Sequence, residues 1–243
     1  MQPKAILFDL DDTLISAYNR PDLAWYSIAH EFAADLHPCA PADVAVAMNL
    51  SADAFWADAA RHRLGRLQLL DARVTIITDA FAALASAGHT APGPDVTHRM
   101  AARYNAFREE QMHLFEGAHH VVDTFRARGV LLALITNGAA APQRAKVTRF
   151  DLTHRFHHIQ IEGEHGFGKP EERAYRHALS VLGVEAADTW MVGDNLEWEV
   201  VAPQQLGIHA IWHDVVGEGL PPNSTARPDR IIRSLPELLT GIA

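Results

Sequence analysis

The sequence has 243 residues, with 21 lysines and arginines against 30 aspartates and glutamates, so its net charge is −9 with neutral histidines. Hydrophobic residues make up 48% and charged residues 21%, a globular composition that argues against a disordered, collagen-like or coiled-coil chain. The acidic balance argues against binding to nucleic-acid polymers or anionic membranes, and a single cysteine, Cys39, cannot form an intramolecular disulfide.

Localisation follows from the length of the apolar runs. No stretch approaches the roughly 20 apolar residues of a membrane span, and the first apolar run is too short for a signal peptide. We therefore expect a cytoplasmic protein without a membrane partner.

The first predicted strand, Ala5–Phe8, runs directly into three acids, Asp9, Asp11 and Asp12. Residues two apart in an extended chain point the same way, so Asp9 and Asp11 can face one site beyond the strand, where parallel sheets bind ligands. Carboxylates this close repel each other unless a cation or a shared proton intervenes, and oxygen ligands suit Mg²⁺. The alternative is that Asp11 or Asp12 only caps a helix.

The stretch from residue 17 to residue 113 has no strand pattern of similar strength. Helical spacing of its apolar residues predicts helices around 25–36, 44–48, 54–70, 75–87 and 96–113, separated by prolines and glycines. We therefore expect an all-helical domain, 17–113, inserted into a core domain made of 1–16 and 114–243.

Apolar runs rich in β-branched residues recur after the insert, each followed by a polar turn and a helical pattern. They predict strands at 130–135, 158–162, 189–192 and 209–212, with a weaker sixth strand at 229–232 and a helix from Ser234. Strands that alternate with helices favour a parallel sheet with helices on both faces. The predicted fold class is α/β, with a Rossmann-like core.

Three further motifs carry polar groups near predicted strand ends. The first is Thr136-Asn137-Gly138, where a hydroxyl and free helix amides suit a phosphate group, although Asn-Gly is also a hairpin signal. The second is Lys169, whose backbone the following proline restrains; it can neutralise carboxylates and phosphate, or it can be a surface lysine. The third is Gly193-Asp194, where the glycine permits a tight turn.

In this order, the four motifs resemble those of the haloacid dehalogenase (HAD) superfamily, in its phosphatase branch with a helical C1 cap. The resemblance implies a Mg²⁺-dependent phosphomonoester hydrolase for a small soluble phosphometabolite, either a sugar phosphate or a nucleotide. It implies that Asp9 attacks phosphorus to form an aspartyl-phosphate, while Asp11 transfers protons. It also assigns Mg²⁺ to Asp9, to Asp11 through its backbone carbonyl, and to Asp194.

The same resemblance assigns the remaining residues of the core site. Thr136, Asn137 and Lys169 would bind the phosphoryl group, and Thr13 would support the acidic turn. Glu199 stands where the family usually has an aspartate that supports the metal site, and its extra methylene is expected to shift it outward. An acid in the first turn of a helix is the alternative for Glu199.

Substrate contacts are expected from the insert, which would close over the site on hinges near 16–20 and 114–117. Asn19 and Arg20 follow the acidic turn, and Arg63 and Arg66 belong to a basic cluster on a helical stretch. The alternative for these residues is a solvated surface. The expected partner is a small phosphorylated metabolite, with no nucleic-acid polymer, and the protein is a monomer or a dimer.

Three other functions stay open for this sequence. A phosphosugar mutase shares all four motifs. A 2-haloacid dehalogenase attacks carbon and has no use for an acid at Asp11 or for a metal, so it is less favoured. A non-catalytic binding protein of the same fold is disfavoured by the intact set of acids and Lys169.

Histidine is abundant, with 15 residues, which raises the question of a metal site. The histidines are scattered, and the adjacent pairs lack the His-x-x-x-His spacing that sets two imidazoles on one helix face. We therefore expect solvated or hydrogen-bonded histidines rather than metal ligands.

Overall fold

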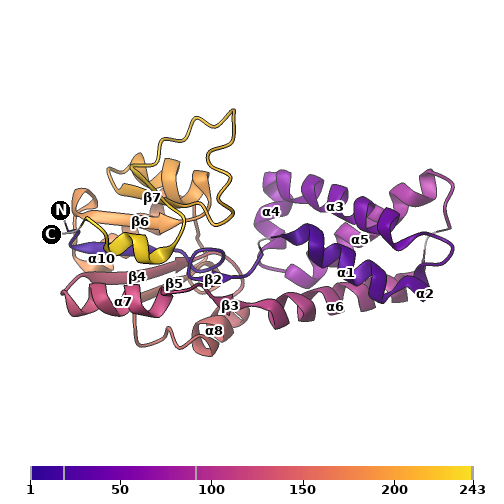
Figure 1. Ribbon diagram of the computed structural model, residues 1–243, viewed down its shortest axis with the longest axis horizontal. Helices are drawn as coiled ribbons and strands as arrows, with labels where there is room; N and C mark the ends of the chain where they lie inside the picture. Colours follow the sequence, from indigo (N-terminus) through magenta and orange to yellow (C-terminus); the bar gives the residue numbers. More distant parts are fainter. Residues whose placement is uncertain (1, 19, 91, 242–243) are drawn as a thin grey trace. The chain divides into compact units, whose positions relative to one another are not determined.

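The computed structural model describes residues 2–18, 20–90 and 92–241 of the chain (Figure 1). The chain divides into two compact units. Unit 1 comprises 1–17 and 113–243, and unit 2 comprises 18–112. Within the described ranges, no helix combines the length and the apolar character needed to cross a membrane.

Unit 1 is built on a six-stranded sheet in the order β5-β4-β1-β6-β7-β8, with every neighbouring pair parallel. Its strands are β1 (Ala5–Phe8), β4 (Leu131–Thr136), β5 (His158–Ile161), β6 (Thr189–Gly193), β7 (His209–His213) and β8 (Arg230–Ile232). All six predicted strands are present within one residue of their expected bounds, and the α/β fold class is confirmed. Because β4 lies parallel to both neighbours, the Asn-Gly hairpin does not occur.

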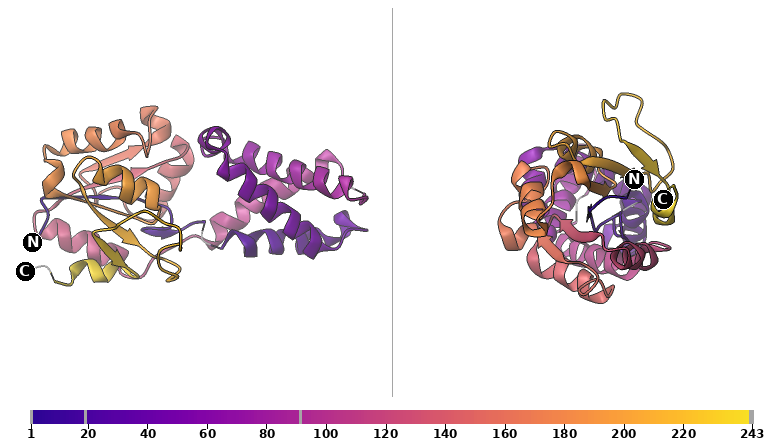
Figure 2. Two further views of the ribbon diagram at one scale, coloured as in Figure 1. Left: turned by 90° about the horizontal axis from the view of Figure 1, so that it is seen from above. Right: turned by 90° about the vertical axis from the view of Figure 1, so that its left-hand side faces the viewer.

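Helices cover both faces of this sheet (Figure 2). They are α7 (Ala118–Ala127), α8 (Ala140–Arg149), α9 (Glu162–His165), α10 (Glu172–Leu182), α11 (Ala202–Gln204), the 3₁₀ turns η1 (Ala186–Asp188) and η3 (Leu235–Leu239), and the π-helical turn η2 (Leu196–Val201). Alternate strand residues point to opposite faces. Leu7 and Ala133 pack with Tyr175 of α10 on one face, and Trp190 meets Phe125 of α7 edge-on on the other.

Two short antiparallel strands lie in unit 1, next to the two places where the chain passes between the units. β2 (Ile15–Ser16) pairs with β3 (His113–Leu114), although the sequence indicates no strand at either place. Two residues are too few to form a recognisable alternation, so the pairing is invisible before the chain is folded. Ser234 caps η3 through a reciprocal capping box with Glu237, as expected for a helix that begins there.

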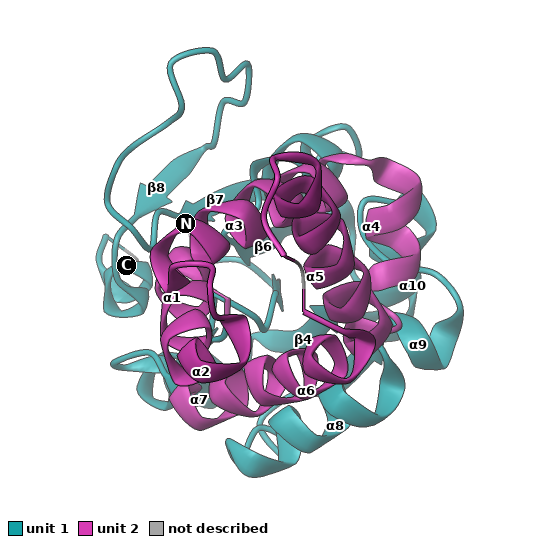
Figure 3. Cartoon of the chain, turned by 90° about the vertical axis from the view of Figure 1, so that its right-hand side faces the viewer, with its two compact units in different colours: residues 1–17, 113–243 teal, residues 18–112 magenta. Residues whose placement is uncertain are grey.

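All regular secondary structure in the described residues of unit 2 is helical, with loops between the helices (Figure 3). Its helices are α1 (Pro21–Glu31), α2 (Ala33–Leu36), α3 (Pro41–Ala57), α4 (Ala59–Gly65), α5 (Leu69–Ser86) and α6 (Pro94–Gln111). The apolar sides of α1, α3, α5 and α6 share one core, in which the Trp25 ring stacks on Tyr104 with centroids 3.8 Å apart.

One predicted helix of unit 2 is wrong. The expected helix over 54–70 is interrupted at Asp58, which is extended and accepts a hydrogen bond from the Arg61 amide at 2.8 Å. An aspartate in this position satisfies an amide that a new helix would otherwise leave free. The chain therefore starts α4 here, and it begins α5 only at Leu69.

Candidate functional site

The polar motifs meet at the carboxyl ends of three adjacent strands. Asp9 follows β1, Thr136 ends β4 and Asp194 follows β6, and the sheet order sets β1 between the other two strands. The Asp9 amide donates to the Val192 carbonyl at 2.9 Å, which continues the β1–β6 ladder by one residue. This fixes the backbone of Asp9 at the centre of the sheet edge.

The acidic turn after β1 holds its own shape. The Leu10 carbonyl accepts hydrogen bonds from the amides of Leu14 (2.9 Å) and Ile15 (3.0 Å). Asp12 has φ of +58°, and its carboxylate accepts a hydrogen bond from the Ala17 amide at 2.8 Å. Asp12 therefore serves the turn itself. Thr13 is buried, with its hydroxyl 3.5 Å from the Asp194 carboxylate.

Lys169 is the buried cation between Asp9 and Glu199. Its Nζ lies 2.5 Å from Asp9 Oδ1 and 2.7 Å from Glu199 Oε1, and its side chain is 1% exposed. The surface-lysine alternative is therefore wrong. A buried ammonium between two carboxylates is stable only because both partners are present.

Asn137 positions this lysine through its backbone. Asn137 Oδ1 accepts from the Lys169 amide at 2.8 Å, and Nδ2 donates to the Lys169 carbonyl at 2.7 Å. A Cβ on Gly168 would lie 2.5 Å from Asn137 Oδ1, so only glycine allows this approach. The Asn137 side chain thus holds Lys169 in position.

The amides after β4 are not all free, contrary to expectation. Gly138 donates its amide hydrogen to Glu162 Oε2 at 3.0 Å, and Glu162 is buried. Glu162 was not among the predicted site residues, because it follows β5, whereas the turn that it completes follows β4. Thr136 remains at the end of β4 with its side chain buried.

Glu199 points inward, so the expected outward shift is wrong. Its Oε2 accepts from the Asn195 amide at 2.7 Å while Oε1 meets Lys169, and the side chain is 1% exposed. A Cβ on Gly193 would lie 2.0 Å from Glu199 Cγ. The glycine before Asp194 therefore leaves space for the glutamate, and its φ is not positive.

Two residues of α8 also belong to the site, although they were not among the predicted site residues. Lys146 Nζ lies 2.8 Å from both carboxylate oxygens of Asp11, and Gln143 Nε2 lies 3.0 Å from Asp11 Oδ2. Gln143 also reaches Thr136 Oγ1 at 2.6 Å. Their spacing of three residues puts both on one helix face, a signal that carries meaning only once α8 is known to face the acids.

Asp9, Asp194 and Glu199 outnumber Lys169, the buried cation that lies among them, whereas Lys146 is paired with Asp11. Burial raises the pKa of Asp9, although Lys169 opposes this effect. Burial, reinforced by Glu199 and Asp9, raises the pKa of Asp194 well above its usual value, and burial raises that of Glu199 to about 7. Burial alone would lower the pKa of Lys169, but the charges of Asp9 and Glu199 outweigh it and raise the pKa.

The excess of buried carboxylates over cations indicates whether the site could hold a metal ion. Asp9, Asp194 and Glu199 would all ionise more readily if a second cation lay among them, because burial raises the pKa of all three and Asp9 further raises that of Asp194 and of Glu199. The donors are all oxygens, which is the set that Mg²⁺ prefers. The residues present therefore fit Mg²⁺.

The predicted substrate residues belong to unit 2. Arg20 is exposed and pairs with Asp22 at 3.0 Å. Arg63 is exposed on α4, and Arg66 follows that helix half-buried. Asn19 lies outside the described residues. The contact of these residues with a substrate stays a prediction.

Comparison with known proteins identifies a hydrolase family and related phosphatases. Residues 3–207 match the family model of the haloacid dehalogenase-like hydrolases. A phosphoserine phosphatase from Thermus thermophilus is 37% identical over 139 residues, 56% of this chain and 55% of the relative. The match thus spans about half the length of that enzyme. Pyrimidine 5'-nucleotidase PynA from Streptococcus pneumoniae is 27% identical over 238 residues, 97% of this chain and 93% of the relative.

A solved structure agrees with the fold described above. The HAD-hydrolase YfnB from Bacillus subtilis, determined with bound magnesium, matches with a TM-score of 0.69 and 20% identity, and the match covers 100% of both chains. At this identity the likeness concerns the fold alone.

Proposed function

The chain belongs to the haloacid dehalogenase-like hydrolase family, and on that premise we propose that it is a phosphatase that hydrolyses a small phosphomonoester through an aspartyl-phosphate on Asp9. One observation carries the proposal. Asp9 is held by the buried Lys169 at 2.5 Å, while Asp11 is held apart by Lys146 at 2.8 Å. Two carboxylates with separate cationic partners suit a nucleophile and a proton carrier.

The reaction uses these residues in two steps. Asp9 attacks phosphorus, the bond from phosphorus to the leaving oxygen breaks, and Asp11 gives its proton to that oxygen. Asp11 then takes a proton from water as the water attacks the aspartyl-phosphate, which releases inorganic phosphate and restores Asp9. Thr136 and Lys169 bind the phosphoryl oxygens, and Asn137 keeps Lys169 in position.

Mg²⁺ would be held by Asp9, the backbone carbonyl of Asp11 and Asp194, with Thr13 and Glu199 supporting them. When bound, it supplies positive charge that offsets the phosphate and the buried acids. The raised pKa of Asp194 supports this assignment, because burial among other carboxylates leaves it short of a counter-charge.

The substrate is proposed to be a small phosphorylated metabolite. The relatives named above are a phosphoserine phosphatase and a pyrimidine nucleotidase, so an amino-acid phosphate joins the sugar phosphates and nucleotides already expected as candidates. Unit 2 is proposed as the cap that selects among them, with Arg20, Arg63 and Arg66 as its candidate contacts. A cytoplasmic location also stays a prediction.

The activity has a direct test with p-nitrophenyl phosphate as the substrate. We expect turnover with Mg²⁺ and loss of nearly all turnover in EDTA, with recovery when excess Mg²⁺ is restored. Released nitrophenol is measured by absorbance. Turnover that is indifferent to chelation would contradict the proposal.

The mutase alternative is distinguished by its product. A mutase returns an isomeric sugar phosphate, whereas a phosphatase releases free phosphate from each substrate consumed. A panel of sugar phosphates, nucleotides and phosphoserine, scored for inorganic phosphate and for isomers, separates the two and ranks the substrates. The acid at Asp11 disfavours the haloacid dehalogenase.

Lys146 is expected to matter through Asp11. Lys146→Met removes the ammonium that lies 2.8 Å from both Asp11 oxygens, and we expect kcat to fall about 10- to 100-fold with a smaller change in KM. Steady-state kinetics on the best substrate of the panel measures this split. Arg149→Met is the matched control, because Arg149 is an exposed cation on the same helix. Equal kcat values in the two variants would show that Asp11 does not need Lys146.

A further inference from the structure

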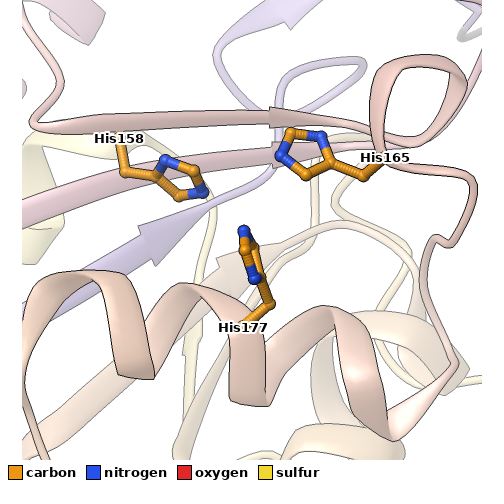
Figure 4. A group of neighbouring side chains, drawn as sticks. All are labelled: His158, His165 and His177. Atoms are coloured by element: carbon orange, nitrogen blue, oxygen red, sulfur yellow. The ribbon is translucent and has the colours of Figure 1, made fainter.

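A second cluster of metal-binding side chains lies away from the carboxylates. His158 begins the edge strand β5, His165 ends α9 and His177 lies on α10. One ring nitrogen from each histidine lies within 4.8 Å of the other two, and all three residues are half-buried. Figure 4 shows the three imidazole rings pointing toward one another from these separate elements.

Hydrogen bonding leaves His165 ready to bind a metal. Its Nδ1 lies 3.1 Å from the Ile161 carbonyl oxygen, which can only accept a hydrogen bond. Nδ1 therefore carries the hydrogen, and the neutral ring keeps its lone pair on Nε2. Metal-binding histidines commonly fix their tautomer by this kind of bond to a backbone carbonyl.

His158 has a nitrogen that no protein group satisfies. In the described part of the chain, its Nε2 is buried and has no hydrogen-bond partner. Burial is the largest effect on its pKa and lowers it, against a smaller opposing effect of the Gln160 side chain. The ring is therefore neutral near pH 7, which is the form that binds metals.

An aromatic ring, Phe167, lies beside the cluster, and the Arg173 guanidinium lies over that ring, 4.0 Å from its centroid. Phe167 packs edge-on against His165 and His177, with centroids 5.7 Å and 5.5 Å away, so it shields one side. The nearby positive charge of Arg144 is offset by Glu164, whose carboxylate lies 2.6 Å from it. The three imidazoles also pack edge-on against one another, with ring centroids 5.2 Å to 6.0 Å apart, which keeps their nitrogens close together.

We propose that His158, His165 and His177 form a binding site for a late first-row divalent metal ion such as Zn²⁺, separate from the carboxylate site. Imidazole nitrogens suit Zn²⁺, Ni²⁺ and Cu²⁺, whereas Mg²⁺ takes oxygen ligands. Zn–N bonds of about 2.0–2.1 Å bring tetrahedral ligands to roughly 3.4 Å from one another, so the ring nitrogens, which lie within 4.8 Å of one another, would close by up to roughly 1.4 Å on binding. Water completes the coordination.

The ion would act as a clamp on the segment that carries Lys169. His165 precedes Lys169 by four residues, and His177 lies on the helix that follows it. Binding would join β5, α9 and α10 around the turn 166–168. The site could not be predicted from histidine spacing, because no two of the three histidines lie on the same helix.

The test uses the full chain, stripped of metal and then kept in saturating Mg²⁺. Zn²⁺ is titrated against a chromophoric chelator, and Co²⁺ is titrated while its visible absorption is recorded. We expect one tight Zn²⁺ site, four-coordinate Co²⁺ bands, and a higher melting temperature with Zn²⁺. His177→Ala and His165→Ala are each expected to weaken Zn²⁺ binding at least about 100-fold, more than the loss of a supporting group does.

Two controls make the result decisive. His120→Ala removes an exposed histidine from α7 in the same unit and should leave Zn²⁺ binding unchanged. Asp194→Asn alters the carboxylate site and should also retain tight Zn²⁺. Tight binding that survives both histidine variants, or that is lost in Asp194→Asn alone, would overturn the proposal. Neither outcome depends on the phosphatase activity.

Discussion

Asp9→Asn is expected to reduce turnover of every phosphomonoester by at least about 10⁴-fold, because the amide cannot attack phosphorus. The side chain keeps its size, and its backbone amide keeps the bond to Val192, so the sheet edge should be unchanged. The measurement is kcat in Mg²⁺ against wild type, with a discontinuous phosphate assay to reach low rates. Acid-quenched enzyme should carry phosphate on Asp9 in wild type and none in the variant.

Asp12→Asn is the matched control for this variant. Asp12 lies three residues away and carries the same charge, but its carboxylate binds the Ala17 amide within the turn. We expect it to retain turnover within about tenfold, since an asparagine oxygen can accept the same hydrogen bond. Comparable losses in the two variants would mean that the acidic turn, and not the Asp9 carboxylate, is what the reaction requires.

The sheet and its chemistry were predictable because both depend on short-range patterns. An apolar run of four to six residues followed by an acid or a threonine marks a buried strand and the edge where it ends. Asp9, Thr136 and Asp194 could therefore be selected before their contacts were known, whereas Lys169 was selected by its place in the order of the motifs that the resemblance implies. The parallel order of the strands brings three of these residues to one edge.

The contacts between residues far apart in the sequence were not predictable. Glu199 points inward because Gly193 leaves its space empty, a fact that neither residue reveals alone. Gln143 and Lys146 matter only because α8 faces Asp11. The helix break at Asp58 has a local cause, the hydrogen bond that its carboxylate accepts from the Arg61 amide. An aspartate among helix-forming residues does not by itself indicate that a new helix begins there.

Lys169→Met is expected to lower both stability and activity. The variant leaves Asp9 and Glu199 buried without the ammonium that lies 2.5 Å and 2.7 Å from them. Removing one partner of a buried ion pair costs about 3–5 kcal/mol, so the free energy of unfolding should fall by that order in EDTA. We also expect kcat to fall about 100-fold or more, because a donor to the phosphoryl oxygens is lost. Urea unfolding and steady-state kinetics measure the two effects.

The stability lost in Lys169→Met is expected to increase with pH. The pKa of Glu199 is already raised to about 7 in the folded protein, above its usual value, and loss of Lys169 raises it further. A carboxyl group whose pKa is higher in the folded state stabilises the fold when protonated, and this stability is lost as the pH rises. The variant should therefore be nearly as stable as wild type at pH 5 and much less stable at pH 8.

A second substitution identifies the cause of the instability. Glu199→Gln in the Lys169→Met background removes one of the two uncompensated charges and should recover part of the stability lost at pH 8. Lys4→Met is the matched control, because Lys4 pairs with Asp188 at 2.7 Å on the exposed surface and should change stability little. If Lys169→Met unfolds at the wild-type urea concentration at pH 8 in EDTA, the buried carboxylates do not depend on Lys169. Their counter-charge would then have to come from protons that they retain even above pH 7.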